Sequence, residues 1–163
     1  GAPGGGAVAV RKTIEIGGRR MRPELRLTVA VRNNGPQPIR ARMGLEWALM
    51  LLGGGGNPSA WYEIEGNRRA HDSAGSAAGV ELVRQGNDWI GLSIESTPSQ
   101  PADAWWAPIE TVSNSEGGFE RVYQGSSLLL SWRLDLPPGQ EAVFGVTHRV
   151  AAATDRAEAT AAR

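Results

Sequence analysis

Three glutamates stand close together in the second half of the chain and could supply acid–base chemistry. Glu110, Glu116 and Glu120 share one short segment, and a tight turn at Gly117-Gly118 can bring the last two together. Two carboxyl groups flanking one bond are the arrangement that cleaves glycosidic bonds. The structural alternative is that these carboxylates accept hydrogen bonds from backbone amides of the turn or pair with Arg121. We favour this alternative and assign no catalytic residue.

Histidine, serine and cysteine give little support to other chemistry. The chain has 2 His, at His71 and His148, and 0 Cys, and it contains no Gly-x-Ser-x-Gly motif. We therefore expect no metal and no cofactor. His148 lies in the apolar phase of a strand pattern, which predicts a hydrogen-bonded core histidine, whereas His71 beside Asp72 is predicted to be solvated.

Tryptophan is the most frequent aromatic residue, with 6 Trp against 2 Tyr and 2 Phe. Trp47 and Trp132 fall on apolar phases and are expected in the core. Trp61, Trp105 and Trp106 stand beside predicted loops, where flat aromatic rings suit the apolar faces of sugars. The alternative for these three is that they seal a strand end or an interdomain contact.

Glu46 lies opposite the apolar phase of its own strand pattern, next to Trp47. If the carboxylate is buried it needs a cationic or amide partner, because an unpaired buried charge is costly. Arg40 and Arg42 share the phase of Glu46 and could supply that partner.

The elements that must hold these residues are β-strands. Apolar and polar residues alternate along most of the chain, and turn residues such as Pro137-Pro138-Gly139 separate the alternating segments. No segment has the period of an amphipathic helix. The predicted strands span residues 8–16, 25–32, 39–51, 61–65, 80–84, 89–95, 106–113, 119–124, 127–136 and 141–150. The fold class is therefore all-β, a large antiparallel two-sheet β-sandwich over residues 7–150.

Charge and composition exclude several classes. Lys+Arg 17 equals Asp+Glu 17, so the chain lacks the basic surplus typical of proteins that bind nucleic acid or membrane surfaces. It has no apolar run near the roughly 20 residues of a membrane span and no signal segment, so a cytoplasmic location is the default. Residues 1–6 have linker composition and indicate a module of a longer protein, while residues 151–163 are expected to form a flexible or marginally helical tail.

The segment 108–127 carries a specific signature. It reads Thr-Val-Ser-x-Ser-Glu-x-Gly-Phe-Glu from Thr111 to Glu120, followed by Tyr-Gln-Gly at residues 123–125. This segment resembles the C-terminal β-domain of α-amylase and 4-α-glucanotransferase-type enzymes of glycoside hydrolase family 57. The sequence Gly44-Leu45-Glu46-Trp47 resembles that family's long Glu-containing strand.

The resemblance implies a galactose-mutarotase-like supersandwich that follows a distorted (β/α) barrel. The family's catalytic carboxylates belong to the barrel, so the resemblance implies a non-catalytic module that stabilises the barrel and helps to shape its glucan site. The implied partners are the barrel and α-1,4-glucan. The longer enzyme that would contain both the barrel and this module, called the parent below, would hydrolyse or transfer the glucan by the retaining two-carboxylate route. Two alternatives stay open: an autonomous carbohydrate-binding module and, less favoured, a mutarotase-like sugar epimerase with a histidine acid and a carboxylate base.

The candidate contacts to glucan or to the barrel are Trp61, Trp105, Trp106, Glu116, Glu120, Tyr123 and Gln124. Glu46, Gly117 and Gly118 are expected to be structural, because the two glycines permit a backbone turn that a Cβ would strain. The polar segment around them is either a rigid structural corner or a rim that contacts sugar.

Overall fold

The chain folds into β-strands alone over the residues that the structure describes. A computed structural model describes residues 8–54, 56–115 and 118–152. Its strands are β1 Val8–Arg19, β2 Arg22–Asn33, β3 Ile39–Leu49, β4 Ala60–Ile64, β5 Asn67–Ala70, β6 Gly75–Val80, β7 Val83–Asn87, β8 Leu92–Pro98, β9 Ala102–Ser115, β10 Gly118–Leu136 and β11 Glu141–Ala152. Within these ranges no helix has the length and hydropathy needed to cross a membrane.

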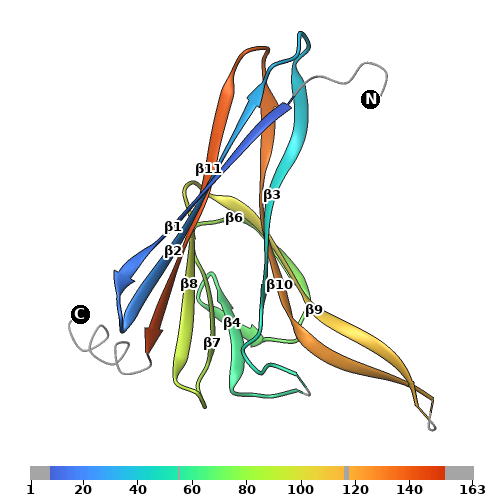
Figure 1. The fold of residues 1–163 in the computed structure, drawn as a ribbon. Coiled ribbons are helices and arrows are strands. Elements are labelled where there is room, and N and C mark those ends of the chain that lie inside the picture. The colour runs from blue at the N-terminus through green and yellow to red at the C-terminus, as the bar shows by residue number, and fades with distance from the viewer. Residues whose placement is uncertain (1–7, 55, 116–117, 153–163) are drawn as a thin grey trace.

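The strands form two antiparallel sheets (Figure 1). The larger sheet has the order β1-β2-β11-β8-β7-β4-β5, and the smaller has the order β3-β10-β9-β6. Inward side chains of both sheets fill the core, including Val29, Tyr62 and Leu128. Trp132 of the smaller sheet packs on Phe144 of the larger, with ring centroids 5.1 Å apart. The prediction of an all-β, antiparallel two-sheet fold is confirmed.

Individual strands differ from the predicted ones where polar residues are buried. Residues 66–79, expected to be a polar connection, contain β5 and all of β6 except its last residue, Val80. Gln85 and Asn87, expected in a turn, are fully buried in β7, and Asn87 Nδ2 donates a 2.8 Å hydrogen bond to the carbonyl of Leu51. Partnered polar side chains of this kind look like turn residues in a sequence although they belong to the core.

The hairpin of β9 and β10 extends past the sandwich. The pairing of β10 with β3 ends at Ser126, and that of β9 with β6 ends at Trp106. We call residues 108–115 and 118–125 the arm, and the part of the hairpin inside the sandwich the root. In Figure 1 the arm projects away from both sheets. A β-bulge between Tyr123 and Gly125 lies where the arm meets the root.

Candidate functional site

A buried polar cluster lies at the root, directly beneath the arm. His71 Nε2 lies 3.0 Å from Gln85 Oε1, and His71 Nδ1 lies 2.9 Å from the hydroxyl of Tyr123. That hydroxyl is 2.6 Å from Ser126 Oγ, which also donates a hydrogen bond to the carbonyl of His71. Because Gln85 Oε1 can only accept, Nε2 carries the imidazole proton, and Nδ1 is the unprotonated ring nitrogen, 2.9 Å from the Tyr123 hydroxyl and 3.2 Å from Ser126 Oγ. Tyr62 stacks on the imidazole at 4.6 Å between ring centroids.

Burial sets the protonation of this cluster. It lowers the pKa of His71 and raises the pKa values of Tyr62 and Tyr123, so all three are neutral at pH 7. A Cβ on Gly53 would lie 2.6 Å from His71 Nδ1, so this glycine lets the backbone close over the ring. The prediction of a solvated His71 is wrong, because its side chain is fully buried. Both of its ring nitrogens are occupied, which suits a structural role.

His148 is the hydrogen-bonded core histidine that the sequence predicts. It is buried, its Nδ1 lies 2.8 Å from Ser96 Oγ, and Trp47 packs edge-on at 4.1 Å between ring centroids. Burial lowers the pKa of His148 to about 4. Trp132 is buried as predicted, and Trp47 is partly buried against the core.

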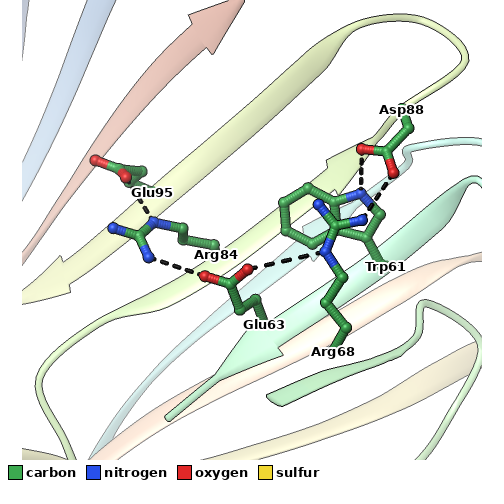
Figure 2. A network of polar contacts seen from close by, with 6 residues as sticks. All are labelled: Trp61, Glu63, Arg68, Arg84, Asp88 and Glu95. Atoms are coloured by element: carbon green, nitrogen blue, oxygen red, sulfur yellow. Dashed lines mark hydrogen bonds and ion pairs between the residues drawn. The ribbon is translucent and has the colours of Figure 1, made fainter. Parts of the chain in front are cut away.

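Trp61 is held under a chain of alternating charges on the larger sheet (Figure 2). Its Nε1 donates a 2.8 Å hydrogen bond to Asp88, and the Arg68 guanidinium lies 4.1 Å from its ring centroid. Gly86 leaves room for the indole, since a Cβ there would lie 2.4 Å from the ring. Trp61 is only 3% exposed. Trp61 is therefore not the exposed sugar contact that the sequence predicts, because almost none of its ring is open to solvent.

The charge chain itself runs from Glu95 to Asp88. Arg84 contacts Glu95 at 2.7 Å and Glu63 at 2.9 Å. Arg68 continues it, 3.9 Å from Glu63 and 2.7 Å from Asp88, as Figure 2 shows. The hydrogen bond to Glu95 is the main cause that raises the pKa of Arg84. The network links β4, β5, β7 and β8 on their outer face.

The two adjacent tryptophans of β9 point to opposite faces. Trp106 is 4% exposed, its ring lies against Gly75, and its Nε1 donates a 3.3 Å hydrogen bond to Ser73. Trp106 is thus a core residue and not the exposed sugar contact that the sequence predicts. Trp105 is 54% exposed on the outer face of the smaller sheet, in one cross-strand row with Leu129 and Glu46. Of the three tryptophans predicted as contacts, Trp105 is thus the one that is exposed.

Glu46 is exposed and needs no buried partner. Its Oε1 accepts a 2.6 Å hydrogen bond from Ser127 Oγ. Arg42 pairs instead with Asp103 at 2.8 Å, and Arg40 lies 3.7 Å from Asp135. The condition under which Glu46 would need an arginine partner, burial of its carboxylate, is not met, because Glu46 is exposed on the outer face of the smaller sheet.

Polar residues of the signature hold the arm in shape. Gln124 occupies the bulge and its Nε2 donates a 3.3 Å hydrogen bond to Thr111 Oγ1. Arg121 pairs with Glu110 at 3.5 Å, while Glu120 is exposed opposite Ser113. Tyr123 reaches into the root cluster, so it is a structural residue here rather than a free contact. Glu116 and Gly117 lie outside the described residues.

The turn end of the arm and its two most exposed apolar side chains complete the description. Gly118 has φ +115°, a conformation that disfavours residues with a Cβ, as expected for a structural glycine. Val112 and Phe119 share the face of the arm that continues the core side of the hairpin. They are 62% and 85% exposed. The sequence analysis did not single them out, although their alternation with polar neighbours is visible. Among the described residues no three His, Asp or Glu side chains are placed to hold a metal ion.

Solved structures define the class of protein to which this fold belongs. An aldose 1-epimerase structure from Escherichia coli K12 matches with a TM-score of 0.60 and 12% identity, over 89% of this chain and 65% of that one. The Slr1438 protein from Synechocystis matches with a TM-score of 0.59 and 14% identity, over 90% of this chain and 56% of that one. The domain is therefore a galactose-mutarotase-like β-sandwich.

Sequence comparison then gives the family. The family model described as Alpha-amylase/4-alpha-glucanotransferase, C-terminal matches residues 1–143, and the chain belongs to this family. Alpha-amylase 1 of Dictyoglomus thermophilum is 37% identical over 114 residues, which are 67% of this chain and 16% of that protein. The 4-alpha-glucanotransferase of Thermococcus litoralis has a TM-score of 0.54 and 20% identity, over 89% of this chain and 18% of that one. The chain thus spans about a sixth of the length of the curated relative it matches.

Proposed function

We propose that residues 8–152 form a non-catalytic module that stabilises the catalytic barrel of an α-glucan-processing enzyme of the glycoside hydrolase family 57 type. The parent protein is the longer polypeptide that carries this module. In this proposal the arm is the docking element, and the barrel covers the face that carries Val112 and Phe119 together with Arg121 and Glu110. Family membership supports the class of parent, and the geometry of the arm supports the mode of contact.

One observation carries the proposal: the arm continues the core face of the hairpin beyond the larger sheet. Val112 and Phe119 stand on that face with 62% and 85% of their surface exposed. A hydrogen bond from Gln124 at the bulge and the Arg121–Glu110 ion pair, on the face of Val112 and Phe119, link the two strands of the arm. A braced hairpin that presents large apolar side chains is typical of an element that packs on a neighbouring domain.

The parent protein with Phe119→Ser tests this role. Burying a Phe against another domain stabilises by about 1.5–3 kcal/mol, so we expect the catalytic domain to unfold at a lower temperature and the interdomain region to be cleaved faster by protease. Glu120→Ser, the next residue on the opposite face of the arm, is the matched control and should have little effect. Equal behaviour of the two variants would exclude docking through this face.

Direct contact with glucan is a second candidate role, and the exposed ring of Trp105 favours it. Stacking of a pyranose on that ring would give weak binding of maltooligosaccharides, which calorimetric titration can measure. We expect Trp105→Ala to abolish that binding and Trp89→Ala to leave it intact, since Trp89 is 77% exposed but lies at the β7–β8 turn. Binding that is absent from the unsubstituted protein, or lost equally in both variants, would count against a Trp105 site.

A further inference from the structure

The first strand of the larger sheet exposes an apolar face that points toward the core side. Its members are Val8, Val10, Ile14 and Ile16, which are 48%, 57%, 63% and 81% exposed. The register with β2 puts Val10 opposite Val31 and Ile14 opposite Leu27, so these side chains share the inner face of the sheet. Lys12 is the charged member of this phase. Both faces of β1 are therefore open, although one has the composition of a core face.

The cause is an overhang of the larger sheet. The smaller sheet ends at β3, which pairs only with β10 among the described strands. Trp47 of β3 reaches His148 of β11, and β2 and β1 continue past that contact. Exposure rises along the row that crosses the overhang: Val146 is 1% exposed, Leu27 is half-buried and Ile14 is 63% exposed.

Two polar atoms at the same place lack partners. Trp47 Nε1 and His148 Nε2 are both buried, and neither has a hydrogen-bond partner within the described ranges. Their rings touch edge to face at the end of the smaller sheet. A buried polar atom without a partner is costly, and native structures rarely leave one uncompensated. These two atoms are enclosed by the described residues and mark the boundary of the covered core.

The segments outside the described range are poor in large apolar side chains. Residues 1–7 and 153–163 contain no Val, Ile, Leu, Met, Phe, Tyr or Trp. The fold comparison points elsewhere, because 89% of this chain matches the aldose 1-epimerase while only 65% of that structure has a counterpart here. The curated alpha-amylase relative likewise extends far beyond the matched region, which is 16% of its length.

We propose that a further segment of the parent polypeptide adds as a β-strand to the free edge of β3 and covers the inner face of β1 with alternating apolar side chains. Edge addition supplies the backbone pairing that β3 lacks, and it extends the smaller sheet across the overhang. The inference rests on this chain being part of a longer polypeptide. It does not depend on docking of the arm, because the arm and the β1–β3 edge are separate surfaces.

Cysteine labelling of the full parent protein tests the proposal, and residues 1–163 contribute 0 Cys of their own to the background. Val10→Cys and Ile14→Cys report the inner face of β1, and Arg11→Cys and Thr13→Cys report its outer face. All four positions are exposed in the present structure. We expect N-ethylmaleimide to label the inner pair at least about tenfold more slowly than the outer pair in the native parent, because a covering strand must open first.

Hydrogen exchange of the unsubstituted parent gives a second reading that does not depend on any variant folding. Backbone amides on the free side of β3 should exchange as slowly as those of β10. Equal labelling of both faces of β1, or rapid exchange along that side of β3, would overturn the proposal. Protection that disappears on dilution would also overturn it, since a second copy of the protein would then be the covering partner.

Discussion

Leu128 and Phe119 lie on the same strand and face the same side of the hairpin, yet their environments are opposite. Leu128 in the root is fully buried, and Phe119 in the arm is 85% exposed. Leu128 sits in a cross-strand row between Trp47 and Trp106, beneath the larger sheet. Phe119 pairs with Asn114 beyond the end of that sheet. The bulge at Gln124 shifts the alternation of β10 by one residue, which keeps Phe119 and Leu128 on the same side of the hairpin, so only their cover differs.

The side edge of the sandwich shows the same difference. Val10 and Val31 are directly paired on the inner face, and they are 57% and 4% exposed. Alternation along a strand decides which face a side chain takes, whereas burial depends on a second layer that other residues must supply. The alternating apolar pattern therefore marks more strand surface for burial than the described residues within 8–152 cover.

The largest expected effect separates root from arm. We expect Leu128→Ala to lower the free energy of unfolding by about 2–5 kcal/mol, because it removes buried methyl groups and leaves a cavity. Phe119→Ala removes a side chain that is mostly in water, so we expect a change within about 0.5 kcal/mol in the 163-residue chain. Urea denaturation at pH 7 measures both.

The outcome sharpens the comparison in either direction. A loss of more than about 2 kcal/mol for Phe119→Ala in the isolated chain would mean that the arm folds back onto the sandwich, since only burial gives that cost. A small effect of Leu128→Ala would mean that the root is loosely packed. Either result would break the distinction between covered and uncovered lengths of β10.

Much of the fold could be predicted from the sequence, since alternation locates β1, β2, β3 and β11 to within a few residues. The missed strands, β5 and β6, have short polar sequences whose neighbours in space decide their conformation. Residues 85–87 look like a turn, but Gln85 lies in a strand, where its buried Oε1 accepts a hydrogen bond from His71 Nε2. That pairing joins residues 14 positions apart and leaves no local signal.

The candidate site was less predictable, for the same physical reason. Trp61 and Trp106 look like exposed aromatics beside loops, but Gly86 and Gly75 lie across the sheet from them and make space for their rings. Only the register between strands reveals this match. The family that the signature indicates is confirmed, although individual residues of the signature serve partly to hold the arm and the root cluster in shape.

A smaller effect, on pH dependence, tests how well the boundary of the covered face excludes water. His148 lies there, between buried Ser96 and half-buried Leu25. Burial lowers the pKa of His148 to about 4, against an ordinary 6.5. Between these pH values the unfolded chain binds the proton and the folded chain does not, so stability falls as pH falls from 6.5 toward 4. The slope from this group is at most about 1.4 kcal/mol per pH unit.

Comparison with His148→Asn isolates this contribution from carboxylates that titrate below pH 5. We expect the variant to lose stability more gradually than the unsubstituted chain between pH 6.5 and 5, measured by urea denaturation at each pH. Nuclear magnetic resonance titration of the imidazole gives the pKa directly. A pKa of His148 near 6.5 would mean that water reaches the ring past Trp47, and the covered region would then end one strand earlier than the structure places it.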